Sequence, residues 1–285
     1  MVKTMDQIFE EIKSRVQVSS EATVQTNYKC TKCRDKGGYI ETRTADVFDN
    51  GVFERDEPVW VECECMKIKK INRLMKSSQI TEEFQKMTFE NFHTEGYSPK
   101  VEKMYDTAFK YCQNFKGIQN TRSNSIAFLG QPGVGKTHLL SAVANGMITR
   151  LIVPTMYFPY VEGMEDLKSN FERLANKLQR LKTVDVLFID DLFKPVSSPN
   201  TKNPLEPIKV PRATQWQVEK MFEVVNYRYL NNKPLLISSE LGFDEMFAID
   251  EALCTRIFEM CQDYIVTIDK DIKLNHRVKK MFNNA

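Results

Sequence analysis

Five short apolar runs alternate with longer amphipathic segments between residues 125 and 268. The runs are rich in β-branched and aromatic residues and lack the polar alternation of a half-exposed strand, which is typical of strands buried on both faces of a parallel sheet. Between them, apolar residues recur at the three- and four-residue spacing of a helix. The pattern predicts an α/β fold with helices at 138–150, 164–181 and 216–230, and strands at 125–129, 154–158, 184–189, 234–238 and 264–268.

The residues before this alternation follow other patterns. Apolar residues at steps of three and four predict an amphipathic helix over 1–16, and a basic helix is expected over 67–76. The segment 77–81 is typical of a boundary, so we expect an N-terminal domain over 1–80 and an α/β domain over 86–285. A Pro-rich insertion over 194–212 matches neither the helical nor the strand period.

Composition excludes several classes of protein. The 285 residues are 27% charged and 42% hydrophobic, and 40 basic residues oppose 38 acidic ones, so the net charge of +2 does not by itself indicate nucleic-acid binding. No apolar run reaches the roughly 18 residues of a membrane span, and charges interrupt the first twenty residues, where a signal peptide would need an apolar core. A cytoplasmic protein is therefore expected, in which the seven cysteines are thiols or metal ligands rather than disulfides.

A phosphate-binding loop is the most specific motif in the chain. The segment 130–137 satisfies the pattern G-x-x-x-x-G-K-[ST], with an apolar strand directly before it and a helix directly after it. Its main-chain N–H groups and the helix N-terminus would hold the phosphates of ATP, Lys136 would add a full positive charge, and the Thr137 hydroxyl would bind Mg²⁺. The expected nucleotide-binding residues are Gly130, Gln131, Pro132, Gly133, Val134, Gly135, Lys136, Thr137 and His138.

A pair of carboxylates supplies the second half of such a site. Asp190 and Asp191 follow the apolar run 186–189, which is predicted to be a buried strand. Asp190 is expected to hold Mg²⁺ together with Thr137, and Asp191 to polarise the water that attacks the γ-phosphate. The alternative is a turn that ends the strand, because Asp favours turns, but the combination with the phosphate-binding loop favours magnesium.

These motifs, with the segments around them, resemble the AAA+ ATPases and, more narrowly, replicative helicase loaders of the DnaC/DnaI type. In that resemblance, residues 88–92 lead into the core and line the adenine pocket, and residues 234–240 form the sensor-1 strand, with Ser239 beside the nucleotide. The stretch around Arg256 resembles the one that carries an arginine finger, which would reach a neighbouring subunit's γ-phosphate in a ring or spiral. Arg277 lies where a second sensing arginine is found, although the neighbouring lysines make a generic basic tail an equal alternative.

The chain departs from the family pattern in three places. Asp191 stands where Glu is commoner, and Glu240 follows Ser239 where the sensor-1 position usually ends in Asn, so we expect slow ATP hydrolysis. The residues after 268 are too few for a full C-terminal helical lid. An adjacent protomer is therefore expected to cover the nucleotide, which favours assembly in the presence of ATP.

Four cysteines form two close pairs in the N-terminal segment. Cys30 and Cys33 are separated by two residues, and Cys63 and Cys65 by one. Tetrahedral Zn²⁺ takes four N or S ligands, so the pairs predict a structural zinc site without an open position, similar to the cysteine module of phage-type loaders. Four unliganded thiols are the alternative. The other cysteines, Cys112, Cys254 and Cys261, are expected in the core.

The sequence therefore predicts an ATP-dependent loader of the hexameric replicative helicase onto single-stranded DNA. The helix 67–76 and the insertion 194–212 carry mostly basic charges that can contact phosphates, although a solvated linker is an equal interpretation of the insertion. The helix 1–16 would either dock on the helicase or pack on its own zinc module. Two other hypotheses are a transposition helper ATPase of the IstB type and an assembly factor that binds ATP without hydrolysing it.

Overall fold

The protein is described here from a computed structural model, in which the chain forms two compact units, Met1–Lys69 and Lys70–Ala285. We call the described part of the first unit the cysteine module and that of the second the α/β domain. The predicted helix over 1–16 lies outside the described residues, and the predicted domain limits of 1–80 and 86–285 stay a prediction. The structure describes residues 28–48, 52–93, 98–169, 171–198, 208–271, 274–276 and 278.

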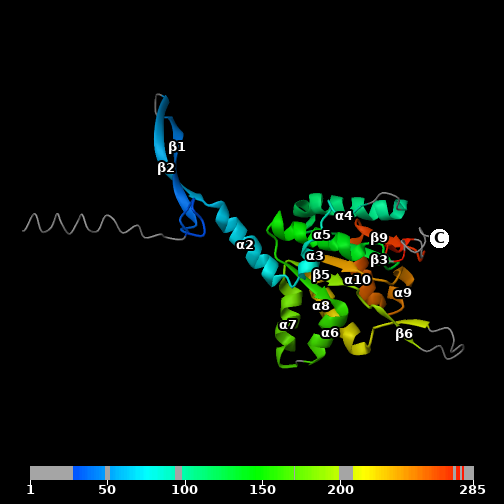
Figure 1. The fold of residues 1–285 in the computed structure, drawn as a ribbon. Coiled ribbons are helices and arrows are strands. Elements are labelled where there is room, and N and C mark those ends of the chain that lie inside the picture. Colours follow the sequence, from blue (N-terminus) through cyan, green and yellow to red (C-terminus); the bar gives the residue numbers. More distant parts are fainter. Residues whose placement is uncertain are drawn as a thin grey trace, which may run out of the picture. The chain divides into compact units, whose positions relative to one another are not determined.

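The cysteine module consists of a cysteine-bearing loop and a long hairpin (Figure 1). Strand β1 (Gly38–Phe48) pairs antiparallel with β2 (Val52–Glu62), from Gly38 opposite Glu62 to Phe48 opposite Val52. Helix α2 (Glu64–Ser77) begins directly after β2 and includes the predicted basic helix. The hairpin was not predicted, because most of its described side chains are exposed and no apolar alternation marks it.

The α/β domain is built on a parallel sheet of five strands, so the predicted fold class is confirmed. The strand order places β5 beside β8 and β8 beside β3, which brings the carboxyl ends of these three strands to one edge. A ligand site is expected at that edge of an open parallel sheet. The order across the sheet is β4 (Thr155–Pro159), β5 (Val186–Asp190), β8 (Leu235–Ser238), β3 (Ile126–Gly130) and β9 (Ile265–Ile268).

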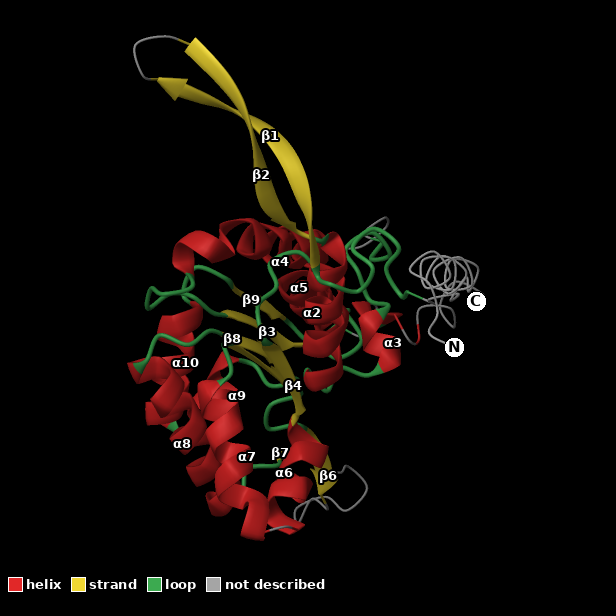
Figure 2. Ribbon diagram, turned by 90° about the vertical axis from the view of Figure 1, so that its left-hand side faces the viewer, coloured by secondary structure: helices red, strands yellow, loops and turns green. Residues whose placement is uncertain are grey.

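Each face of the sheet carries its own apolar core, and helices cover both faces (Figure 2). Alternate residues of one strand enter different cores: Ile126 and Phe128 pack with one set of helices, and Ala127 and Leu129 with the other. The first set comprises α3 (Glu82–Gln85), α4 (Pro99–Ile118) and α5 (Lys136–Thr149). The second comprises α6 (Tyr160–Ser169), α7 (Phe171–Thr183), α8 (Gln215–Leu230), α9 (Phe243–Phe247) and α10 (Glu251–Cys261).

Two predicted elements differ from the structure. The single helix expected over 164–181 is two helices, α6 and α7, and the Nζ of Lys177 on α7 lies 2.7 Å from a carboxylate oxygen of Asp166 on α6. Periodicity could not detect the break because both helices face the same core. The insertion 194–212 was expected to lack strands, but its ends form an antiparallel hairpin of β6 (Pro195–Ser198) and β7 (Ile208–Pro211). Among the described helices, none has the length and apolarity that crossing a membrane requires.

Candidate functional site

The phosphate-binding loop joins β3 to α5 at the carboxyl edge of the sheet. Gly135 caps α5 with a φ of +93°, which is left-handed backbone that favours glycine. A Cβ there would come within 2.5 Å of the Phe92 ring, and one on Gly133 within 2.0 Å of Asn275 Oδ1. The loop is therefore enclosed on two sides, and only glycine fits at these two positions.

Lys136 lies buried inside this loop. Its Nζ donates hydrogen bonds to the carbonyl oxygens of Gly130 and Gln131, both at 2.8 Å. Burial lowers the pKa of its ammonium from 10.5 to about 8, although neighbouring carboxylates oppose the shift. The ammonium is thus held at the floor of the loop by carbonyl groups that carry only partial charge, which leaves most of its charge for a phosphate group.

Asp190 and Thr137 meet at the end of β5. Asp190 Oδ1 accepts hydrogen bonds from Thr137 Oγ1 at 2.9 Å and from Ser238 Oγ at 2.5 Å, and its Oδ2 accepts one from Tyr157 Oη at 3.1 Å. Burial raises the pKa of Asp190, although the hydroxyl groups that donate to it oppose the rise. A hydroxyl and a carboxylate at this distance are the oxygen donors that Mg²⁺ prefers in such sites, so the residues fit the metal.

Sequence reasoning missed Ser238 and Tyr157. Ser238 is the last residue of β8, and Tyr157 lies in β4, the two strands that flank β5. The signal that could have found them is the order of strands in the sheet, which places polar residues of both neighbours beside the end of β5. They hold Asp190 in place without being charged themselves.

A pocket of about 360 Å³ opens over the phosphate-binding loop. It is lined by residues of the loop and of the segment 87–93, and by Asp191 and Glu240 from the ends of β5 and β8. Asp191 Oδ2 lies 2.5 Å from the Nζ of Lys194, which also lines the pocket. Asp191 therefore lines the pocket over the phosphate-binding loop, where it is paired with a cation that the sequence did not single out for this site.

The remaining predicted binding residues occupy different places. His138 Nε2 lies 3.0 Å from the Thr88 carbonyl oxygen, which ties α5 to the segment 88–92, and His138 also lines the pocket, as Pro132 does. Gln131 Oε1 accepts a hydrogen bond from the Asp271 N–H, and Val134 is buried in the core.

Two further predicted residues, Ser239 and Arg256, are not among the described residues that line this pocket. Ser239 is buried, and its hydroxyl donates to the Leu192 carbonyl oxygen at 2.8 Å rather than facing the pocket. Arg277 lies outside the described residues. Arg256 is on α10, where its Nε donates to Asn226 Oδ1 at 3.0 Å and its guanidinium lies 5.0 Å from the Phe222 ring centre. Arg256 could act as an arginine finger only on the nucleotide of a neighbouring subunit, which is also what the prediction assumed.

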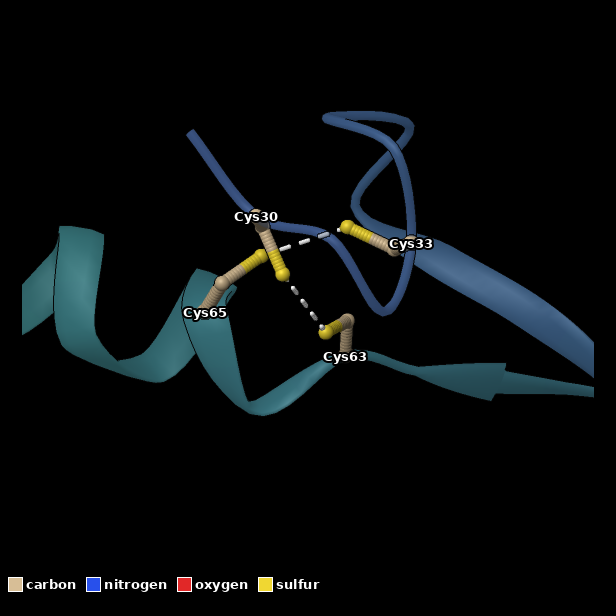
Figure 3. A group of neighbouring side chains, drawn as sticks. All are labelled: Cys30, Cys33, Cys63 and Cys65. Carbon is tan, nitrogen blue, oxygen red and sulfur yellow. Dashed lines mark hydrogen bonds between the residues drawn. The ribbon is translucent and has the colours of Figure 1, made fainter. Parts of the chain in front are cut away.

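The four N-terminal cysteines converge on one point (Figure 3). Their sulfur atoms all lie within 4.8 Å of one another; the Cys30 sulfur lies 3.7 Å from that of Cys63, and the Cys33 sulfur 3.5 Å from that of Cys65. Tetrahedral zinc with bonds of about 2.3 Å separates its sulfur ligands by about 3.8 Å. The geometry thus fits a structural zinc site, and the close pairs join residues that are distant in the sequence.

Local structure holds these cysteines in position. The carboxylate of Asp35 accepts hydrogen bonds from the backbone N–H groups of Lys29 and Cys30, both at 3.0 Å. A hydrogen bond from the Cys33 backbone N–H lowers the pKa of the Cys30 thiol to about 7, whereas desolvation and the neighbouring sulfurs raise that of Cys65 to about 12. Four thiolates cannot share this space unless a cation compensates their charge, which is what zinc does.

Only some of the basic side chains that were predicted to bind DNA are exposed and outside ion pairs in the described residues. In the insertion, Lys194 pairs with Asp191, and Arg212 Nη1 lies 3.5 Å from Glu165 Oε1. The other two lysines of the insertion, Lys202 and Lys209, have no described side chains. In α2, by contrast, Lys67, Lys70, Arg73 and Lys76 are all exposed.

Known proteins resemble this chain along most of its length. The family of IstB-like ATP binding proteins matches residues 69–271. The phage-like element PBSX protein XkdC of Bacillus subtilis (strain 168) is 43% identical over 97% of this chain and 98% of its own length. The replicative helicase loader DnaC of Buchnera aphidicola subsp. Baizongia pistaciae (strain Bp) is 30% identical over 58% of this chain, which spans 66% of that protein. A crystal structure of the DnaC helicase loader matches with a TM-score of 0.52 and 20% identity, over 66% of this chain and 99% of that one, which shows that the fold is shared.

Proposed function

Because the chain belongs to the family of IstB-like ATP-binding proteins and has their AAA+ P-loop fold, we propose that it is an ATPase that loads the replicative DNA helicase onto single-stranded DNA. One observation carries the ATPase part of this proposal: Lys136, Thr137 and Asp190 converge at one edge of the sheet. The loader part is supported by the similarity to a DnaC helicase loader and to a protein of a phage-like element.

The chemistry is the transfer of the γ-phosphoryl group of ATP to water, which yields ADP and phosphate. Lys136 and the N–H groups of the loop neutralise the phosphate oxygens as negative charge shifts onto the leaving ADP. Thr137 and Asp190 would hold Mg²⁺, which when bound draws charge from the β- and γ-phosphates. Asp191 orients the attacking water and takes its proton, and Arg256 of a neighbouring subunit would stabilise the transition state in a ring or spiral.

The cysteine module offers a surface for the helicase. Ile40 and Trp60 stand directly opposite each other on β1 and β2, and they are 68% and 60% exposed. An exposed aromatic and aliphatic pair on a rigid hairpin is suited to insert into a pocket of a partner protein. We assign this pair to the helicase contact, and the exposed basic side chains of α2 to the contact with single-stranded DNA.

The test is capture of purified hexameric helicases by the full chain, with and without Mg·ATP. The wild-type protein should retain a replicative helicase, and Trp60→Ser should weaken that capture by about tenfold or more while ATP binding stays unchanged. Lys136→Ala should lose ATP binding but keep the helicase contact. Capture of a transposase in place of a helicase would instead support a transposition helper of the IstB type, a role that the family match also allows.

A second candidate is an assembly factor that binds ATP and barely hydrolyses it. The ion pair between Asp191 and Lys194 favours it, because a carboxylate that is already paired is a weaker base for water. We expect slow hydrolysis, and a turnover number above about 10 s⁻¹ would contradict that expectation. Measuring phosphate release with and without single-stranded DNA separates the candidates, since the loader should hydrolyse ATP and the assembly factor should not.

A further inference from the structure

Three charged side chains meet on the wall of the nucleotide pocket. The Nζ of Lys194 lies 2.5 Å from Asp191 Oδ2 and 3.7 Å from Glu240 Oε1. All three residues line the same pocket as Lys136 and Thr137. The pocket therefore contains a second cation, besides Lys136, at the edge where β5 and β8 end.

The backbone places Lys194 there through a tight turn after β5. Asp191 and Phe193 both have left-handed backbone, with φ of 57° and 56°, which is unfavourable for non-glycine residues. The turn is closed by the Lys194 N–H, which donates to the Asp191 carbonyl oxygen at 3.0 Å. The Phe193 side chain is fully buried and packs on Tyr160. Such a conformation persists only where the surrounding structure fixes it, so the fold sets the position of the Lys194 backbone at the edge of the pocket.

The same turn is attached to the end of β8, which Glu240 follows. Ser238 accepts a hydrogen bond from the Asp191 N–H on its hydroxyl and one from the Leu192 N–H on its carbonyl oxygen, at 2.8 and 2.9 Å. The Ser239 hydroxyl donates to the Leu192 carbonyl oxygen. These bonds tie together the segments that follow β5 and β8, so the backbone at Lys194 and the backbone at Glu240 are anchored to each other through the strand ends.

Electrostatics explain why a lysine is needed at this position. A γ-phosphate that enters the pocket would meet the carboxylates of Asp191 and Glu240, and like charges at short range repel. The Lys194 side chain is 41% exposed and flexible, so its ammonium can turn from the carboxylates to a phosphate oxygen.

We propose that Lys194 is the residue that contacts the γ-phosphate in this pocket, held ready by Asp191 and Glu240, and that it lets the protein distinguish ATP from ADP. The proposal rests on the proposed function, because it requires the pocket to bind ATP. When the ammonium moves to the γ-phosphate, the Asp191 carboxylate loses its nearest cation and becomes available to the attacking water. A single residue thereby connects recognition of the triphosphate to release of the proton acceptor.

The experiment compares the affinities of Mg·ADP and of a non-hydrolysable Mg·ATP analogue by calorimetry, on the full chain. Lys194→Met should weaken binding of the analogue by about tenfold to a hundredfold and change binding of ADP by less than about twofold, because ADP has no γ-phosphate. Lys194→Arg should restore most of the discrimination, since it keeps the charge. The matched control is Lys177→Met, which removes a lysine that pairs with Asp166 at 2.7 Å on α6 and α7. This control should leave both affinities unchanged.

A second pair of variants tests the charge argument independently. Glu240→Gln should tighten binding of the analogue, and in the Lys194→Met background it should recover part of the lost affinity, because it removes one of the two facing carboxylates. Equal losses for ADP and the analogue in Lys194→Met, or no loss for either, would overturn the proposal while leaving ATP binding intact. If the wild-type protein binds neither nucleotide, the proposed function itself fails.

Discussion

The cysteine module and the α/β domain bury different kinds of side chain. In the described part of the module, the buried side chains are those of Cys33 and Cys63, whereas the α/β domain buries apolar residues on both faces of its sheet. Apolar residues that a core would take in, such as Ile40 and Trp60, stay exposed in the module. We therefore expect the module to depend on a metal ligand for its stability, and the α/β domain to depend on its apolar core.

Removal of the predicted zinc ion should have the largest effect, because it should unfold the cysteine module and spare the α/β domain. Chelation, or Cys33→Ser, should unfold the module and leave Mg·ATP binding unchanged, because structural zinc contributes about 10–16 kcal/mol of apparent binding free energy to small sites. Metal content by mass spectrometry and amide exchange of β1 and β2 measure the two effects. Cys112→Ser, which changes a partly buried cysteine on α4, is the control and should keep the metal. A hairpin that stays protected in chelator would contradict the prediction.

Arg228 tests whether apolar burial alone explains the α/β domain. Its guanidinium is fully buried and donates to five backbone carbonyl groups, among them Leu181 at the end of α7 and Pro234 before β8. Arg228→Met should lower the free energy of unfolding by about 3 kcal/mol or more, since buried carbonyl oxygens lose their donor. Chemical denaturation measures it. Arg150→Met, at an exposed ion pair with Glu90, should cost less than about 1 kcal/mol.

The pH dependence of ATP binding tests how burial in the α/β domain affects Lys136. Lys136 is charged below its pKa of about 8 in the nucleotide-free domain and neutral above it, so binding at high pH must first take up a proton. The dissociation constant of a Mg·ATP analogue should therefore rise about tenfold between about pH 7 and about pH 9. Calorimetry at both pH values measures it, and Lys136→Arg, whose side chain stays charged at both values, should remove the dependence. An affinity that is constant across this range would show that burial does not tune Lys136.

Substitution of Gly146 should have the smallest effect on the stability of the α/β domain. It lies inside α5, and a Cβ there would have no neighbouring atom within 4 Å. Gly146→Ala should stabilise the α/β domain by about 0.4–1 kcal/mol, because it restricts the unfolded chain. Gly133→Ala is the opposite case, because it adds a Cβ at a φ of +76° beside Asn275, and it should destabilise the domain. Thermal unfolding compares them, and equal shifts for both variants would contradict the argument from local geometry.

Much of the fold and of the nucleotide site could be predicted from local sequence patterns. The five buried runs are strands within two residues of the predicted limits, because a strand buried on both faces needs continuous apolar residues. The loop at 130–137 lies between a strand and a helix as predicted, since its glycines and Lys136 act within one short segment. The break between α6 and α7 escaped prediction, because both helices show the same apolar period toward one core.

The sequence by itself determined the candidates for the chemistry: the loop around Lys136, the two carboxylates at the end of β5 and the four cysteines of the module. Only the tertiary structure decided their partners. In the sequence, Lys194 is one lysine of a basic insertion. In the structure it lines the pocket, because β5 lies beside β8 and Glu240 is thereby brought close to Lys194. Likewise, Cys30 Sγ comes to lie 3.7 Å from Cys63 Sγ, although the two residues are 33 positions apart. Such contacts join segments that are distant in the chain, and no local pattern records the order in which strands and turns meet.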